Sequence, residues 1–194
     1  MCSAICFVMF VTSFQATAAQ STVDPGRIQR GLLRDIHPTS IEELTKSADV
    51  VLRGRLIRRR TFLRDDIYII TEYEIRQPEI ISGSLAPVAS AKPGEVLPIT
   101  LGVFGGEMTI NGETIKAEDH AMASEITSGE EYLLFLRKFG RDPGQYQLHD
   151  GGIFEIAEGR ARALVKGAET IFKGTSRAPV RELIDRVRAE GTVK

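Results

Sequence analysis

Hydrophobic and polar residues alternate along most of this chain, a pattern that is typical of β-strands with one buried face. Over residues 49–60 the apolar side chains of Val50, Leu52 and Leu56 share one face. Residues 67–76 alternate in the same way, with apolar residues or threonine at the odd positions. The two runs predict neighbouring strands in which an arginine-bearing face lies beside a glutamate-bearing face. The polar positions concerned are Arg53, Arg55, Arg59, Glu72, Glu74 and Arg76.

Two later segments carry the clearest local signals. Residues 108–115 predict a hairpin with a two-residue turn, because Asn111 and Gly112 both tolerate the positive φ that this turn needs. Residues 132–136 are apolar at every position, which favours a central strand buried on both faces. The remaining predicted strands are residues 146–148, 152–156 and 161–165.

Prolines and paired glycines mark the interruptions. Residues 96–104 predict a strand that Pro98 would push to a sheet edge, since proline lacks the N–H used in pairing. The proline-containing residues 77–94 predict a long loop. The pairs Gly105-Gly106 and Gly151-Gly152 predict bends or bulges in the strands around them.

A short helix is predicted at each end of the β region. Ser40 and Glu43 have the spacing of a capping box, so a helix should begin there and end near Ser47. A C-terminal amphipathic helix should end at Gly191. Its apolar positions are Val180, Leu183, Ile184 and Val187. Strands and helices do not alternate, which argues against a parallel nucleotide-binding sheet. The pattern favours a mainly β fold, either a small antiparallel barrel or a closed sandwich.

The first 18 residues have the order of a secretory signal peptide: an apolar run over residues 4–14, a polar stretch, then small residues. We predict cleavage after Ala18, with Ala19 as the alternative. The apolar run is too short to span a bilayer. It departs from the usual signal in having no preceding Lys or Arg, and the alternative interpretation is a buried N-terminal helix or strand.

The predicted organisation is a signal peptide over residues 1–18, a flexible lead-in over residues 19–38 and one mainly β domain over residues 39–191. This places the mature protein outside the cytoplasm, either in a periplasm or secreted. Both cysteines, Cys2 and Cys6, fall within the predicted signal. The mature domain therefore has no disulfide and must fold by burial of apolar surface alone.

The overall charge bears on the partner. The chain has 25 basic and 26 acidic residues, a net charge of −1, whereas nucleic-acid binding needs a basic excess. It contains no tryptophan and 7% aromatic residues, so the aromatic platforms used to stack sugars or bases should be scarce. No stable membrane span is expected after removal of the signal. The expected partner is a protein or an envelope component of unknown identity, and the oligomeric state stays open.

The densest charge run consists of six arginines between residues 53 and 64. One hypothesis is an anion site for acidic polysaccharide or phosphate. The hypothesis that we favour is a solvated strand face whose arginines pair across to Glu72 and Glu74. The six residues are Arg53, Arg55, Arg58, Arg59, Arg60 and Arg64.

Residues with catalytic or metal-binding chemistry are few. The three histidines are far apart in the sequence and are expected at the surface or in turns. Two acidic pairs, Glu118-Asp119 and Glu130-Glu131, are candidates for a hydrolytic carboxylate pair, but acidic turns are common. We therefore predict no catalytic, cofactor-binding or metal-binding residue, and no cofactor. The histidines are His37, His120 and His149.

Several motifs follow one another in a recognisable order: residues 40–44, 48–55, 71–75, 105–106 and 129–136. This order resembles an uncharacterised family of exported bacterial proteins. It is distantly similar to the netrin-like module of tissue inhibitors of metalloproteinases. That resemblance implies a barrel of the oligonucleotide/oligosaccharide-binding (OB) type. Those inhibitors bind zinc through an N-terminal cysteine, which the predicted mature chain lacks, so no functional residue is carried over.

Three classes of function follow in order of preference. The first is an exported, non-enzymatic binding module that contacts a protein or envelope component through its loops. The second is an enzyme inhibitor that works by loop insertion, and the third is a small hydrolase. A basic, aromatic-lined groove would favour polysaccharide binding. Converging histidine and carboxylate side chains would favour catalysis, and an exposed apolar loop would favour a protein partner.

Overall fold

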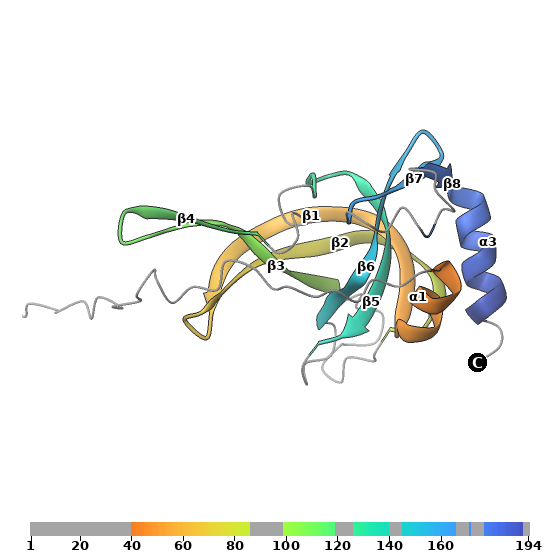
Figure 1. Ribbon diagram of the computed structural model, residues 1–194, viewed down its shortest axis with the longest axis horizontal. Helices are drawn as coiled ribbons and strands as arrows, with labels where there is room; N and C mark the ends of the chain where they lie inside the picture. Colours follow the sequence, from red (N-terminus) through yellow and green to blue (C-terminus); the bar gives the residue numbers. More distant parts are fainter. Residues whose placement is uncertain are drawn as a thin grey trace, which may run out of the picture.

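The computed structural model describes residues 40–85, 99–118, 126–139, 145–165, 171 and 177–191 (Figure 1). The helices are α1 (Ile41–Ser47) and α3 (Val180–Gly191). The strands are β1 (Val50–Arg64), β2 (Tyr68–Gly83), β3 (Ile99–Ile110), β4 (Glu113–Glu118), β5 (Glu131–Lys138), β6 (Gln145–Ala157), β7 (Arg160–Ala163) and β8 (Arg177–Pro179). The predicted signal peptide and lead-in, residues 1–38, lie outside the described residues.

The strands are hydrogen-bonded in the order β4-β3-β2-β1-β5-β6-β7-β8, and β3 also pairs with β6. This additional pairing closes a ring of five strands, β1-β2-β3-β6-β5. The fold is therefore mainly β with two short helices, as predicted. The closing pair is parallel, over residues 100–102 and 145–147, so the prediction of a wholly antiparallel arrangement is wrong there. A short hairpin makes its two strands antiparallel, but β3 and β6 are separated in the chain by β4 and β5, so this constraint does not apply to them.

The core is centred on β5, which lies between β1 and β6. All five side chains of residues 132–136 are fully buried, which confirms the predicted central strand. On β1, Val50, Leu52 and Leu56 are buried as the alternation predicts. The two faces of β5 are therefore both covered, one by the inside of the ring and one by the elements packed outside it.

The helices pack against each other at one end of the ring (Figure 1). The hydroxyl oxygen of Ser40 accepts a hydrogen bond from the backbone N–H of Glu43 at 3.1 Å, which confirms the predicted cap of α1. The four predicted apolar positions of α3 are all buried. A Cβ at Gly191 would collide with the side chain of Ser82, so this glycine allows the end of α3 to approach β2 closely.

β2 continues through residues 77–83, which the sequence predicted to begin a long loop. Gln77 has a φ of 51°, and residues 77–78 stand opposite Gly54 alone, between the pairs Arg53↔Glu79 and Arg55↔Arg76. This is a β-bulge, the position within a sheet where proline is tolerated. Pro78 therefore bends the strand without ending it. Residues 86–98, which include Pro98 and half of the predicted loop, lie outside the described residues.

β3 is an inner strand of the ring, so its predicted place at a sheet edge is wrong. It pairs with β2 over residues 99–104 and with β6 over residues 100–102. The first described residue of β3, Ile99, is already paired with Ile75 of β2.

At the Gly105-Gly106 pair, β3 leaves β2 and begins to pair with β4. Both glycines have positive φ, 97° and 126°. The buried hydroxyl of Thr71 donates to the Gly105 carbonyl at 2.8 Å, and a Cβ at Gly106 would collide with the same hydroxyl. The predicted bend is confirmed. Residues 105–118 then form a projecting hairpin, here called the hairpin arm (Figure 1).

The turn of the hairpin arm is the predicted Asn111-Gly112 pair, with φ of 53° and 83°. The apolar side chains of the arm pack against residues at the end of β1 and the start of β2, and together they form a second, smaller core. That core comprises Ile69, Ile115 and Ala117, with Leu63, Met108 and Ile110 partly buried against it. The predicted strands 146–148 and 152–156 are one continuous strand, β6, in which Gly151 (φ 73°) lies at a register shift.

Candidate functional site

The partly exposed aromatic residues gather on one face of the ring. Among the described residues, five aromatic side chains belong to the core: Tyr73, Tyr132, Phe135, Tyr146 and Phe154. The other four are partly exposed: Phe62, Tyr68, Phe104 and Phe139. Three of these four line a single pocket of about 300 Å³, and Tyr68 packs edge-on against Phe104 with ring centroids 5.8 Å apart.

We call this cavity the aromatic–arginine pocket. Its lining comes from β1, β2, β3, β6 and the residue that follows β5. The lining residues are Arg60, Phe62, Arg64, Ile70, Glu72, Thr100, Gly102, Phe104, Phe139, Gln145, Tyr146 and Gln147.

The pocket lies on the outer face of the sheet. Leu101 and Val103 of β3 are buried in the core, so the alternating residues Thr100, Gly102 and Phe104 point away from it. The cross-strand neighbours Glu72↔Gly102 and Ile70↔Phe104 continue the same face onto β2. The pocket is therefore built outside the ring, where a ligand can approach without disturbing the core.

A β-bulge in β1 turns the side chains at the end of this strand towards the pocket. The register with β2 shifts between Arg58 and Arg60, after which Arg60 pairs with Glu72 and Phe62 with Ile70. Beyond this shift the even-numbered residues of β1 line the pocket. Without the extra residue the opposite set of side chains would face the pocket, because neighbouring residues of a strand point to opposite faces.

Each arginine of the pocket lies over a phenylalanine ring. The guanidinium carbon of Arg60 is 4.9 Å from the centroid of Phe62, and that of Arg64 is 4.5 Å from the centroid of Phe139. Such pairs combine stacking with attraction between the cation and the ring face. Both guanidinium groups are therefore held beside aromatic rings of the pocket lining.

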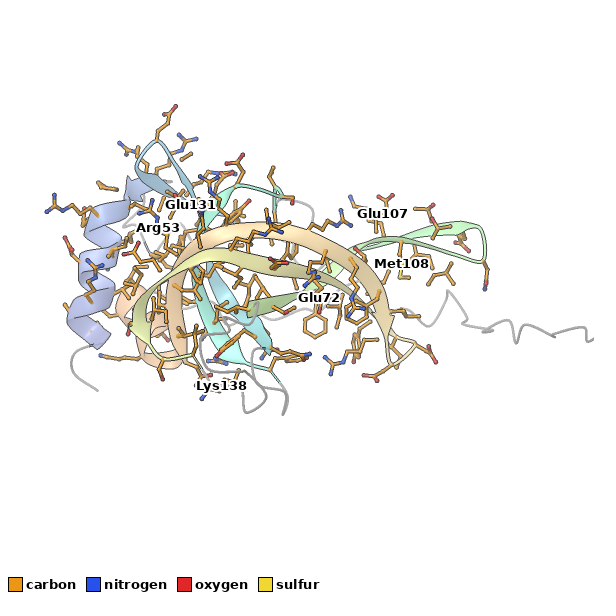
Figure 2. The ribbon with its side chains drawn as sticks, turned by 180° about the vertical axis from the view of Figure 1, so that it is seen from behind. Arg53, Glu72, Glu107, Met108, Glu131 and Lys138 are labelled. Atoms are coloured by element: carbon orange, nitrogen blue, oxygen red, sulfur yellow. The ribbon has the colours of Figure 1, made fainter. Side chains whose placement is uncertain are left out.

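The carboxylate contacts of the two arginines differ. Arg60 Nε donates to Glu72 Oε2 at 2.7 Å. Arg64 Nε is 3.8 Å from Asp65 Oδ2, beyond hydrogen-bond distance. Figure 2 shows Glu72 between the helix end of the molecule and the hairpin arm. Arg64 is therefore the cation better placed to bind an additional anion.

Gly102 leaves the floor of the pocket open. A Cβ at this position would have only ordinary contacts, 3.7 Å to Ile70 Cγ2 and 4.0 Å to the Tyr146 carbonyl oxygen. By contrast, a Cβ at Gly152 would lie 2.8 Å from Phe135 Cβ. Packing thus requires glycine at position 152 but not at position 102. The missing side chain at 102 is part of the shape of the pocket.

Neutral polar groups line the wall where β3 meets β6. Thr100 pairs with Gln145 and Gly102 with Gln147 in the parallel ladder. Within the described part of the chain, the side chains of Thr100, Gln145 and Gln147 make no hydrogen bond. Their hydroxyl and amide groups can therefore donate to or accept from a ligand.

Two of the six arginines of the run, Arg59 and Arg60, make the predicted pairs with Glu74 and Glu72. Arg59 lies 3.5 Å from Glu74, and Arg60 lies 2.7 Å from Glu72. Arg76 also contacts Glu74, at 3.0 Å. These contacts confirm pairing to Glu72 and Glu74. The sequence interpretation did not anticipate that Arg60 and Arg64 would at the same time line a pocket.

Arg53 has a partner that the sequence did not indicate. Its guanidinium donates two hydrogen bonds of 2.9 Å to Glu131 of β5, and these bonds raise the pKa of Arg53. The pair lies near the helix end of the molecule, apart from Glu72 of the pocket lining (Figure 2). Glu131 was a candidate for a hydrolytic carboxylate pair, and here it serves as a structural partner of Arg53. The side chain of Glu118 and residue Asp119 lie outside the described residues.

Only one of the three histidines lies in the described residues. His149 is buried rather than at the surface, which corrects the sequence expectation. Arg137 Nη2 donates to His149 Nε2 at 2.7 Å and Arg137 Nε donates to the Ser47 carbonyl at 3.2 Å, so the arginine covers the ring. His37 and His120 lie outside the described residues. Within the described ranges, no three His, Cys, Asp or Glu side chains are grouped closely enough to hold a metal ion.

No protein-family model matches this chain, and a search of curated proteins found none with significant similarity to it. None of the described helices is both long enough and apolar enough to cross a bilayer.

The pocket had a weak signal in the sequence. The low aromatic content argued against a stacking platform. That argument considered the number of aromatic residues and not their positions. Phe62, between Arg60 and Arg64, and Phe104, after Thr100 and Gly102, are aromatic residues on otherwise polar or open strand faces. A contiguous group of partly exposed aromatic residues, and not the total aromatic content, marks a binding surface.

Proposed function

We propose that this protein is an exported, non-enzymatic binding module that contacts an envelope component through the aromatic–arginine pocket. The observation that carries the proposal is the gathering of Phe62, Phe104 and Phe139, with two arginines, around one cavity outside the core. Pockets that bind ligands are mostly apolar, with a few converging polar groups. The order of small and apolar residues in the first 18 positions supports export.

The topology of the ring supports an OB-type barrel within this proposal. The strands of the ring follow the order β1-β2-β3-β6-β5, and β6, the fifth ring strand along the chain, pairs in parallel with β3. In OB-type barrels, ligands bind on the face of the second and third strands. The same face, formed here by β2 and β3, carries Ile70, Glu72, Gly102 and Phe104.

The contacts of the acidic residues support a non-enzymatic role. Glu72, the acidic residue of the pocket lining, is bound by Arg60 at 2.7 Å. Glu131 is bound by Arg53 through two hydrogen bonds. A carboxylate held in this way by an arginine has fewer oxygen lone pairs left to accept a proton from a substrate.

An enzyme inhibitor acting by insertion is the second candidate, and the observation in its favour is the projecting hairpin arm (Figure 1). The tip of the arm is polar, at Asn111, Gly112 and Glu113. Its apolar residues Met108 and Ile115 turn towards the second core instead. The arm therefore presents a less suitable inserting surface than the pocket presents as a binding surface.

The test is capture of envelope components by the purified protein, immobilised as wild type or as Gly102→Leu. Leucine at position 102 should fill the pocket, and the captured component should be lost. Thr109→Leu adds the same side chain at an exposed position of β3 in the hairpin arm and should retain capture. The captured material is identified by mass spectrometry and sugar analysis. Equal capture by wild type and Gly102→Leu would refute the pocket as the binding site.

A further inference from the structure

We infer that the aromatic–arginine pocket binds an acidic saccharide carrying one carboxylate per sugar ring. This inference rests on the proposed function and names the ligand of the same site. Its premise is a cavity that combines aromatic rings, guanidinium groups and neutral hydrogen-bonding side chains. A sugar acid matches all three, because its ring has an apolar C–H face, its carboxylate is anionic and its hydroxyls both donate and accept.

The apolar part of the pocket suits a ring. Phe62 and Ile70 are cross-strand neighbours, as are Ile70 and Phe104, so the three side chains form one continuous apolar floor. Gly102 lies next to these three residues and has no side chain that would cover them. The volume, about 300 Å³, is at the small end for ligand pockets, so it accommodates a short segment of a chain.

The charged residues of the pocket lining favour a ligand with a single carboxylate. The two arginines and Glu72 give the pocket lining a net charge of +1. Arg60 already binds Glu72, whereas Arg64 makes only a 3.8 Å contact with a carboxylate of the described residues, that of Asp65. Arg64, held over Phe139, is the group that would take the carboxylate of the ligand in a charge-assisted pair. A nucleic acid would need a longer row of cations along its phosphates.

The sheet edges at the pocket argue against a peptide ligand that adds a strand. In this mode an extended peptide pairs with a free sheet edge. At this pocket the backbones of residues 100–102 and 145–147 are already paired with each other. The polar side chains on the same wall, Thr100, Gln145 and Gln147, remain for a ligand that presents hydroxyls.

The experiment is calorimetric or NMR titration of the purified protein with oligomers of galacturonate, mannuronate and guluronate, two to four rings long. Each oligomer is paired with its carboxyl-reduced form, which keeps the ring and loses the charge. At least one acid should bind, and its reduced form should bind about tenfold more weakly or worse, as expected when a charge-assisted hydrogen bond is lost. Binding should weaken as the NaCl concentration rises.

Variants locate the site. Gly102→Leu should abolish binding, and Arg64→Gln should weaken binding of the acid about tenfold while leaving the reduced form unchanged. Arg76→Gln is the matched control, because Arg76 is an exposed arginine of β2 outside the pocket lining. Thermal melting of each variant checks that the fold is intact.

Three outcomes would overturn the inference. Equal binding of acid and reduced oligomers would refute the acidic class, while loss of both in Gly102→Leu would leave the proposed function standing. Failure of every oligomer, with pocket-dependent capture of an envelope protein, would refute the saccharide and keep the binding module. Binding that survives Gly102→Leu would refute both the ligand assignment and the proposed site.

Discussion

The carboxylate of Glu42 in α1 accepts two hydrogen bonds from the guanidinium of Arg186 in α3, at 2.8 and 3.0 Å. The two residues are 144 positions apart in the sequence. The pair therefore joins the helix that precedes the ring to the helix that follows it. Hydrogen bonding to Arg186 is the main cause that lowers the pKa of Glu42 from 4.5 to about 2, against the opposing effect of burial.

This pair predicts a specific dependence of stability on pH. The folded pKa of Glu42 is below its unfolded value, so the pair stabilises the fold above about pH 4.5 and loses its contribution as pH falls towards 2. Because the Glu42 side chain is 35% exposed, solvent screening limits the effect at pH 7 to about 1 kcal/mol. Glu42→Gln should lower the free energy of unfolding by about that amount at pH 7 and by progressively less below pH 4.5.

Urea unfolding at several pH values measures the difference between wild type and Glu42→Gln. Glu190→Gln is the control, since Glu190 pairs with Lys46, whose side chain is 67% exposed, and should cost less. A difference between wild type and Glu42→Gln that does not change from pH 7 to pH 3 would contradict the assignment.

Local signals predicted local structure in this protein. The Asn111-Gly112 turn, the cap at Ser40 and the buried strand over residues 132–136 depend on neighbouring residues, and all were confirmed. Pro78 shows where this reasoning failed. Its effect depends on the partner strand, where Gly54 leaves room for a bulge.

The pocket could not be predicted from the sequence pattern, for a related reason. Its lining depends on the register shift between Arg58 and Arg60, which exists only because β1 pairs with β2. It also depends on the pairing of β3 with β6, whose partners Thr100 and Gln145 are distant in the sequence. Alternation within one strand predicts which side chains share a face. It does not predict which strand is the neighbour or in which register the two strands pair.

The central strand, β5, should not tolerate a charged side chain at its buried positions. Leu134 is fully buried, and an aspartate there would lack any partner, at a cost of several kcal/mol against the roughly 5–15 that stabilise a domain. Leu134→Asp and Phe135→Asp should therefore abolish soluble expression. Arg55 is exposed and donates one hydrogen bond to the Gly129 carbonyl, so Arg55→Ala should cost less than about 1 kcal/mol. Comparable damage from Arg55→Ala would mean that the faces of β1 are misassigned.

The bend that starts the hairpin arm should depend on Thr71. Its buried hydroxyl donates to the Gly105 carbonyl, and valine has the same shape without the donor. Thr71→Val should lower the free energy of unfolding by about 1–3 kcal/mol, because a buried acceptor loses its partner. Thr109→Val removes a hydroxyl from an exposed threonine pair of the arm, 3.3 Å apart, and should change stability far less. Chemical denaturation compares the two, and equal effects would argue against the role of Thr71.

Export predicts a processed N-terminus. The small residues Ala16, Thr17 and Ala18 follow the apolar run and fit the positions that a signal peptidase recognises. Protein isolated from its host should therefore begin at Ala19 or Gln20, as determined by N-terminal sequencing. Recovery of the chain with Met1 intact would show that the first 18 residues are not a cleaved signal.

Two glycines in extended strands should respond in opposite ways to the same change. A Cβ at Gly54 would lie 2.8 Å from Ile75 Cγ2 and 3.2 Å from the Arg76 carbonyl oxygen, so neighbouring groups must move. Gly54→Ala should destabilise the protein by about 1–3 kcal/mol, the usual cost of overpacking.

At Gly102 the added methyl group meets no atom closer than 3.7 Å. Alanine also restricts the unfolded chain more than glycine, so Gly102→Ala should be neutral or stabilise the fold by up to about 1 kcal/mol. Thermal and urea unfolding of both variants provide the measurement. Position 102 lines the pocket. If the Gly102→Ala protein is stable but binds its ligand more weakly, glycine at this position is required for binding and not for folding. Destabilisation by Gly102→Ala as large as that by Gly54→Ala would instead show that the fold itself requires this glycine, and the open floor would then need no functional explanation.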